Sequence, residues 1–336
     1  MESIYGLTKN DLSLFLASHG RSKNLAVIIY ETLYKKKSKQ ILSTETWNLL
    51  RNNYSFDLPV ISVSSKANDG TYKFLIEFVD GKKVETVLIP FHKRYTICLS
   101  SQVGCAMKCS FCYTGTMGLT RHLKTSEIIG QYMVVKKFLE TEIATAALIP
   151  NIVFMGQGEP LHNFDEVQKA LEILLDSEGA ALGPRQITLS TAGYLPGLKK
   201  FNLMPNINLA LSLHSPFNQT RKDLIPITGQ YPIEEIFSAL DKVKLMKRQF
   251  ITYEYLLIAE VNDGLKDADE LQNLLGKRKS IINIIPFNPF PGSTYKRPTE
   301  ESVENFKAML VERKLRTMVR LTKGTEILAA CGQLIS

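Results

Sequence analysis

Hydrophobic and polar positions follow two different periods in the N-terminal part of this 336-residue chain. In residues 1–57 the apolar side chains recur at roughly helical spacing, which predicts a small helical domain. In residues 58–94 apolar and polar side chains alternate, and the pairs Asp69-Gly70 and Asp80-Gly81 are typical of hairpin turns. We therefore expect a β-meander, or β-hairpin extension, after the helices. Its strands are expected at residues 60–65, 72–79 and 84–89.

From residue 95 to residue 336 short apolar runs alternate with longer segments of helical period. Strands separated by helices pair in parallel, and right-handed crossovers curl such a sheet into a full or partial barrel. The pattern therefore predicts an α/β fold for this main domain. Its strands are expected at 96–100, 151–155, 186–190, 206–213, 252–258 and 281–286. Its helices are expected at 126–139, 165–175, 221–224, 233–246, 266–275 and 300–313.

Charge and cysteine usage narrow the class of protein. The formal net charge of +8 favours a polyanionic partner such as RNA or DNA, and the basic run Lys35–Lys39 could contact phosphates or simply be a solvated helix end. Five cysteines, three of them within eight residues, are not a secreted disulfide framework. There is no signal pattern and no apolar run of about 18 residues. We therefore expect a cytoplasmic protein that is not embedded in a membrane.

Three cysteines, Cys105, Cys109 and Cys112, are spaced as C-x-x-x-C-x-x-C directly after the first expected barrel strand. Three thiolates can hold three irons of a 4Fe-4S cluster and leave the fourth iron open to a small molecule. The alternative is a zinc site, which needs a fourth ligand. His92, His122 or Cys98 could supply it.

Polar residues also follow the other expected strands, at the end of a barrel where active sites gather. Gly156-Gln-Gly-Glu-Pro160 follows the second strand, Ser190 ends the third, His214 follows the fourth, and Asn288 follows the sixth. Taken singly, each of these could be a strand-end cap or a buried, hydrogen-bonded side chain. Their common place after the strands favours a binding site.

Together the cysteine motif and the glycine-rich segment resemble the radical S-adenosylmethionine (SAM) superfamily, which implies a partial (β/α)6 radical SAM barrel. The resemblance implies that the cluster's open iron chelates SAM, and that an electron from a donor such as a flavodoxin system cleaves SAM to a 5′-deoxyadenosyl radical. It also implies a set of SAM-binding residues. These are Gly158, Glu159, Ser190, Ser212, Leu213, His214 and Asn288.

Several further segments resemble one family within that superfamily. They are 84–87, 100–105, 158–161, 286–292 and the C-terminal Ala329-Ala-Cys-Gly-Gln-Leu334. This combination is similar to the RlmN/Cfr family of RNA adenosine methyltransferases, from about Glu85 to Leu334. The resemblance implies RNA as the partner of a monomer, with domains at 1–57 (helical, RNA-binding-like), 58–94 (meander) and 95–336 (barrel). Arg94, Lys108, Arg121 and Lys124 are candidates for phosphate contacts near the cluster.

The resemblance also gives roles to the remaining two cysteines. Carbon 2 or carbon 8 of adenine is a poor nucleophile, whereas a sulfur can accept a methyl group from SAM. Cys331 is implied to carry this methyl, which becomes a methylene radical with the help of a second SAM and adds to the adenine. Cys98 is then implied to act as a base and to resolve the RNA–protein crosslink by forming a disulfide with Cys331. Glu85 matches a glutamate assigned as a proton acceptor.

The substrate implied in this way is 23S rRNA, and possibly tRNA. Carbon 2 is the leading target, because 158–161 and 287–292 resemble the carbon-2 branch, but 212–218 and 231–235 resemble the carbon-8 branch. Two other readings stay open. One is a different radical SAM reaction, which would not need the Cys98–Cys331 pair, and the other is a zinc-stabilised RNA-binding protein without catalysis.

Overall fold

The computed structural model describes residues 1–35, 42–92, 94–143 and 149–335. Its centre is one sheet of ten strands in the order β14-β13-β12-β11-β10-β9-β6-β5-β4-β3. Within this sheet, every pairing from β6 to β14 is parallel. The parallel strands are β6 (Arg94–Cys98), β9 (Asn151–Phe154), β10 (Ile187–Thr191), β11 (Asn208–Ser212), β12 (Ile251–Leu257), β13 (Ser280–Pro286) and β14 (Thr317–Val319).

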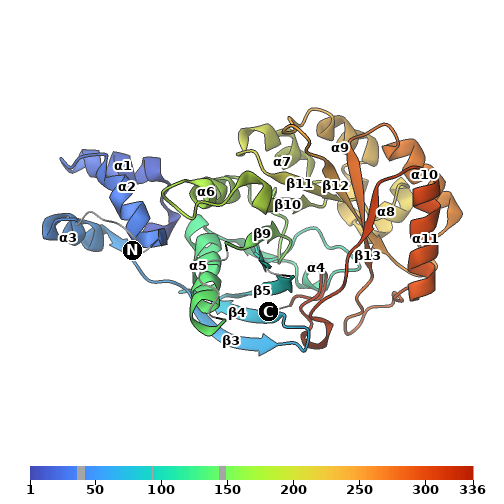
Figure 1. The fold of residues 1–336 in the computed structure, drawn as a ribbon, viewed down its shortest axis with the longest axis horizontal. Coiled ribbons are helices and arrows are strands. Elements are labelled where there is room, and N and C mark those ends of the chain that lie inside the picture. The colour runs from blue at the N-terminus through green and yellow to red at the C-terminus, as the bar shows by residue number, and fades with distance from the viewer. Residues whose placement is uncertain (36–41, 93, 144–148, 336) are drawn as a thin grey trace.

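Helices cover the outer face of this curved sheet (Figure 1). They are α5 (Thr125–Glu142), α6 (Phe164–Leu175), α7 (Leu195–Lys199), α8 (Asn218–Leu224), α9 (Ile233–Leu240), α10 (Leu265–Leu275) and α11 (Glu300–Glu312). Helix α6 illustrates the packing, because its buried residues Val167, Ala170, Leu171 and Leu174 form one apolar stripe. The two edge strands of the sheet, β14 and β3, do not pair with each other. The predicted partial barrel of the α/β class is confirmed.

The predicted meander is a continuation of the same sheet. Strands β3 (Val60–Lys66), β4 (Tyr72–Glu77) and β5 (Lys83–Phe91) pair antiparallel, and β5 pairs antiparallel with β6. Gly70 and Gly81 have φ of 82° and 75°, the left-handed conformation that these hairpin turns need and that glycine adopts without strain. Because β5 and β6 are neighbours, residues of the meander reach the carboxyl end of the first barrel strand.

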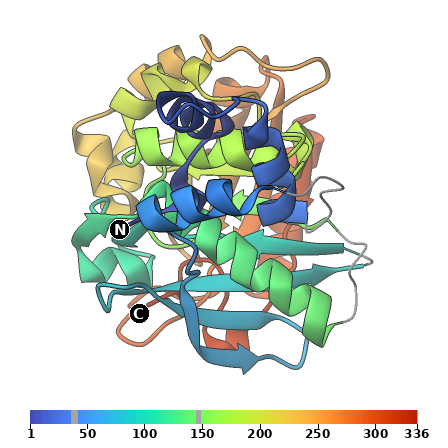
Figure 2. The same ribbon diagram turned by 90° about the vertical axis from the view of Figure 1, so that its left-hand side faces the viewer.

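The N-terminal segment packs on the barrel through α5 and α6 (Figure 2). Its buried residues, such as Leu12 and Ile29, belong to the same hydrophobic cluster as the barrel core, and Lys9 pairs with Asp176 at 2.8 Å. Lys36–Lys39 of the predicted basic run lie outside the described residues. The elements are β1 (Glu2–Ser3), η1 (Ile4–Gly6), α1 (Lys9–Ser18), α2 (Leu25–Tyr30), η2 (Glu31–Lys35), α3 (Thr44–Asn53) and β2 (Tyr54–Ser55).

Some expectations about the barrel differ from the structure, and the short helix α7 is one element that was not expected. The strand β14 was not predicted, because three residues are too few to show a period of two. The helix expected at 233–246 ends at Leu240, and a turn follows in which the Gln249 side chain accepts the Met246 N–H and donates to the Ile207 carbonyl. No helix within the described ranges is long and apolar enough to cross a membrane.

Candidate active site at the carboxyl end of the barrel

The three clustered cysteines lie in a loop held by a small hairpin. Strand β7 (Gln102–Gly104) pairs antiparallel with β8 (Leu119–His122), and α4 (Tyr113–Met117) lies between them. The Cys105 N–H donates to the Gly118 carbonyl at 2.9 Å. Gly104 has φ of 74°, and a Cβ there would lie 1.9 Å from the Gly118 oxygen. Only glycine therefore lets the loop close directly before its first cysteine.

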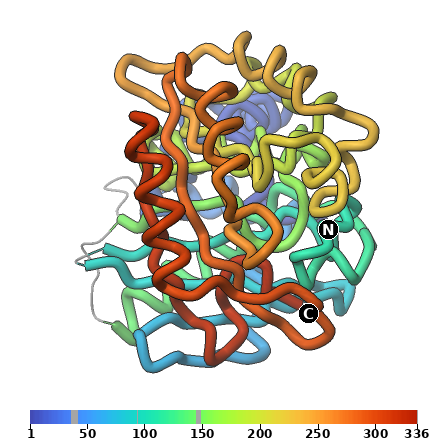
Figure 3. The backbone as a smooth tube through the Cα atoms, turned by 90° about the vertical axis from the view of Figure 1, so that its right-hand side faces the viewer, coloured from blue at the N-terminus to red at the C-terminus, as the bar shows by residue number. Residues whose placement is uncertain are grey.

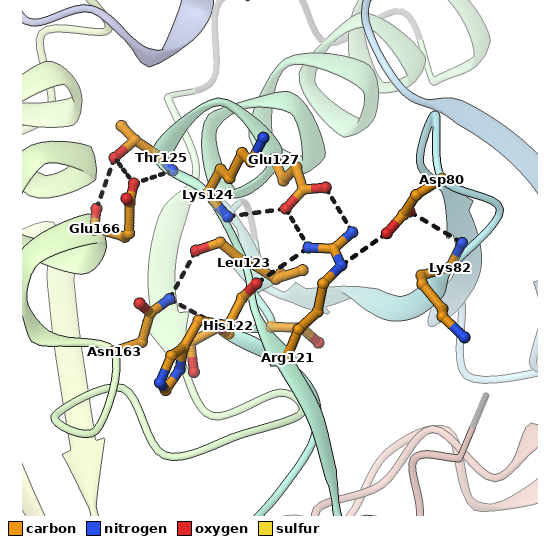
Figure 4. Close-up of polar contacts among 12 residues, drawn as sticks. Asp80, Lys82, Arg121, His122, Leu123, Lys124, Thr125, Glu127, Asn163 and Glu166 are labelled. Carbon is orange, nitrogen blue, oxygen red and sulfur yellow. Dashed lines mark hydrogen bonds and ion pairs between the residues drawn. The ribbon is translucent and has the colours of Figure 1, made fainter. Parts of the chain in front are cut away.

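Polar contacts fix the second strand of this hairpin to the barrel (Figure 4). The Arg121 guanidinium pairs with Asp80 and with Glu127, each at 2.8 Å. The Asn163 amide donates to the carbonyls of Ser101 and Leu123 at 2.9 and 2.8 Å. Arg121, a candidate for phosphate contact, is thus engaged by two carboxylates and braces the loop. The other three candidates are exposed: Arg94, Lys108 and Lys124.

The cysteine loop and the strand ends line one cavity with about 870 Å³ of empty space, part of which is open to solvent. Most of the predicted site residues line it. They are Cys105, Cys109, Cys112, Gly158, Glu159, Ser190, Ser212, His214 and Cys331. Several lining residues were missed because they lie within strands or directly after strand ends and belong to no recognisable motif. They include Met155, Ala192, Glu254, Ile285 and Arg320.

Glu159 presents a buried carboxylate to this cavity. Its two oxygens accept the N–H groups of Leu161 at 3.0 Å and of Ala192 at 2.7 Å. Burial nevertheless raises the pKa of Glu159 to about 7. Gly158, with φ of 101°, packs so closely on Gln102 that a Cβ would lie 2.6 Å from it. A cationic ligand such as an ammonium group would compensate this carboxylate in the cavity.

His214 is held as a neutral imidazole. Its Nδ1 accepts the Leu256 N–H at 3.0 Å, and burial, together with the charge of Arg221, lowers its pKa to about 3. Leu213 is placed differently from the other predicted SAM contacts. Its side chain lies in the barrel core, its N–H donates to the Glu254 carbonyl, and its own carbonyl accepts a bond from Arg221. Leu213 is not among the described residues that line the cavity.

The three cysteines fit an iron–sulfur cluster better than a single metal ion. All three line one cavity, and three thiolates are the ligand set that leaves one iron of a 4Fe-4S cluster open to a small molecule. His122 bonds the Gln102 amide at 2.9 Å. His122, a predicted candidate for the fourth zinc ligand, is therefore engaged by Gln102.

A second cavity, with about 510 Å³ of empty space, shares the lining residues Met155, Ile285, Arg320 and Cys331 with the first. Cys98, the last residue of β6, lines this second cavity together with Cys331, although 233 residues separate them. Burial raises the pKa of the Cys98 thiol to about 12, while the charge of Arg320 opposes that shift. The interaction with Cys331 is the main cause that raises the pKa of Arg320 itself. The structure therefore places one cation beside both sulfurs.

Asn288 belongs to this second cavity and not to the first. Its Nδ2 donates to the Cys331 carbonyl at 3.3 Å, and its Oδ1 accepts a bond from Arg297 at 2.7 Å. The expected contact with adenine through this amide is not tested by these bonds and stays a prediction. In the structure, Asn288 positions the backbone of Cys331.

The C-terminal segment that carries Cys331 is tied to the meander and to the cluster loop, and Figure 3 shows it passing beside the meander. Tyr113 donates its N–H to the Gly332 carbonyl at 2.6 Å. Glu85 accepts the Ile335 N–H at 2.8 Å and pairs with Lys73 at 2.9 Å. Burial raises the pKa of Glu85 despite Lys73. Glu85 lines neither cavity, so the structure shows an anchor, and its role as proton acceptor stays a prediction.

Lys73→Met is expected to loosen this C-terminal segment. Losing one partner of a buried pair costs about 3–5 kcal/mol, and because Lys73 is partly exposed we expect about 2 kcal/mol here. Hydrogen–deuterium exchange of residues 328–335 should become about tenfold faster or more. The double variant Lys73→Met/Glu85→Gln should recover much of the protection, since no buried charge is left unpaired.

The matched control is Lys83→Met, which removes the exposed pair with Glu77 on the same sheet and should leave this exchange unchanged. Equal exchange in the Lys73→Met and Lys83→Met proteins would contradict the anchoring role.

Comparison with known proteins gives a consistent result. Residues 99–272 match the family model for the radical SAM superfamily. The dual-specificity RNA methyltransferase RlmN of Geotalea uraniireducens is 37% identical over 98% of this chain and 96% of its own length. That of Syntrophobacter fumaroxidans is 42% identical over 84% of this chain and 82% of its own. The crystal structure of a radical SAM methyltransferase from Sphaerobacter thermophilus superposes with a TM-score of 0.89 at 34% identity, covering 99% of both chains.

Proposed function

This chain belongs to the RlmN family of radical SAM RNA methyltransferases, and on that premise we propose that it methylates carbon 2 of an adenosine in 23S rRNA and also in tRNA. The proposal includes a methylated Cys331 and a transient RNA–protein crosslink. The observation that carries it is the position of Cys331 at the junction of the two cavities, beside the cluster cysteines on one side and Cys98 on the other.

The first cavity would hold a 4Fe-4S cluster on Cys105, Cys109 and Cys112, with SAM against the strand ends. When bound, these groups supply a methyl donor and a carbon-centred radical that removes hydrogen. The buried Glu159 carboxylate suits the ammonium group of SAM, and Ser190 and Ser212 offer hydroxyls to its carboxylate or ribose. The neutral His214 can donate from Nε2, because its Nδ1 already accepts the Leu256 N–H.

Cys331 would accept a methyl group on its sulfur from one SAM. After this methyl loses hydrogen, with a second SAM consumed, its carbon forms a bond to the adenine carbon and joins RNA to protein. Loss of the proton on that ring carbon, and of one electron that the oxidised cluster could take back, would complete the crosslink.

Cys98 would then attack the Cys331 sulfur. The S–S bond forms, the C–S bond breaks, and the methylene carbon keeps the electron pair and takes a proton to become methyl. A thiol reductant must reduce the disulfide before the next cycle. Cys98 and Cys331 are not joined by a disulfide in the structure, as this order of events requires at its start.

The choice of RNA and of carbon 2 rests on resemblance. The curated relatives carry the name dual-specificity RNA methyltransferase, and the segments ending at Leu161 and Gly292 resemble the carbon-2 branch. The net charge of +8 suits an RNA partner. We further propose that the protein acts as a monomer and takes its electron from a flavodoxin-type donor.

The decisive experiment is mass spectrometry of nucleosides from purified 23S rRNA and tRNA, taken from cells with and without this gene product. Loss of 2-methyladenosine from both RNAs, restored by a plasmid copy, is the expected result. Loss of 8-methyladenosine instead would overturn the choice of carbon, and loss from only one RNA would overturn the dual specificity. Unchanged levels of both nucleosides would overturn the proposed reaction.

A further inference from the structure

Arg221, in helix α8 behind the first cavity, is completely buried without a carboxylate partner. Its guanidinium donates only to neutral groups: the carbonyls of Leu213 (3.1 Å), Ala192 (2.7 Å) and Ser212 (2.9 Å), and the Thr228 hydroxyl (2.6 Å). In the part of the chain that the structure describes, no Asp or Glu forms an ion pair with it. A buried cation is costly unless a negative charge lies close by, so this arrangement needs an explanation.

The geometry around Arg221 points toward the cysteine loop. Two of its four partners, Ala192 and Ser212, line the first cavity, and so does Cys109. The Ser110 N–H, directly after Cys109, donates to the Leu224 carbonyl at 3.0 Å, so the helix that carries Arg221 is bonded to the cysteine loop. The guanidinium is permanently charged and fixed by four hydrogen bonds, so it cannot turn toward another anion.

We propose that Arg221 is an electrostatic positioning residue, the built-in counter-charge of an iron–sulfur cluster bound at Cys105, Cys109 and Cys112. This rests on the proposed function, because it requires the cluster to occupy the first cavity. A cluster with three thiolate ligands gains one further negative charge on reduction, and a fixed cation nearby stabilises that reduced state. Arg221 therefore raises the cluster's reduction potential and makes the electron that the reaction needs easier to deliver.

The competing explanation is mechanical. The four hydrogen bonds tie the ends of β10 and β11 to the segment at Thr228, and a buried arginine could serve only as a brace. The two explanations differ in what they predict for the potential. Loss of a brace lowers stability and leaves the potential unchanged, whereas loss of a counter-charge makes the potential more negative.

The test compares wild type with Arg221→Met, Arg221→Gln, Arg221→Lys and Thr228→Val. Each protein is reconstituted anaerobically, its iron is counted, and the reduced cluster is titrated by electron paramagnetic resonance at defined solution potentials. Either neutral variant should lower the ratio of reduced to oxidised cluster about tenfold at a fixed potential, equivalent to about 59 mV for one electron. Arg221→Lys keeps the positive charge, so its cluster reduction potential should be closer to that of wild type than the potential of either neutral variant.

Thr228→Val is the matched control, because it removes one hydrogen bond of Arg221 without changing the charge. It should lower the thermal unfolding temperature and leave the potential unchanged. Arg221→Gln keeps an amide that can donate to the same carbonyls, so it answers the question if Arg221→Met does not fold. If a neutral variant has the same cluster reduction potential as wild type, Arg221 serves only as a structural brace and the proposal is wrong. If wild type itself takes up no iron, the proposed function fails, not the assignment of Arg221 alone.

Discussion

Cys331→Ala is expected to abolish RNA methylation, with a loss of rate on the order of a thousandfold or more, as is usual when a covalent nucleophile is removed. The reason is that adenine carbon 2 cannot take a methyl group from SAM by simple displacement. Cys331 lines both cavities, so no other described cysteine is placed to act between them. The measurement is transfer of labelled methyl from SAM to RNA transcripts by reconstituted protein.

Cys331→Ser is the matched control, since it preserves size and polarity and replaces only the sulfur. It should be as inactive as Cys331→Ala, and both proteins should keep wild-type iron content, because Cys105, Cys109 and Cys112 are intact. Methyl transfer at a rate near wild type in either variant would contradict the methyl-cysteine route and favour a different radical SAM reaction.

Cys98→Ala is expected to accumulate a covalent RNA–protein adduct at close to one RNA per active protein. This variant should still methylate Cys331 and still form the bond to adenine, but it lacks the thiol that breaks that bond. Cys98 is buried beside Cys331 in the second cavity, where it can reach only a group held there. The adduct should appear on a denaturing gel as a slower band that collapses on treatment with ribonuclease.

The double variant Cys98→Ala/Cys331→Ala should give no such band, which shows that the adduct depends on Cys331. Repeated turnover by Cys98→Ala with release of free methylated RNA would remove Cys98 from the resolving step.

Local sequence was enough to locate most of the fold and much of the site. The period-two runs gave β3, β4 and β5, and the alternation of strand and helix gave the partial barrel, because both patterns repeat within a few residues. Cys105, Cys109 and Cys112 are so close in sequence that they must lie in one loop. Their short spacing is therefore enough to predict that they line the same cavity. Ser190 and His214 could be placed because parallel strands deliver their carboxyl ends to one edge.

Only the tertiary structure decided how distant residues meet, because no local period records contacts between segments hundreds of residues apart. It brought Cys98, Cys331 and Asn288 into one cavity. It made Glu85 an anchor of the C-terminal segment through Lys73. Nothing in the sequence distinguished Arg221 from a surface arginine, since its importance arises from burial without a carboxylate partner, a property that only the packed barrel creates.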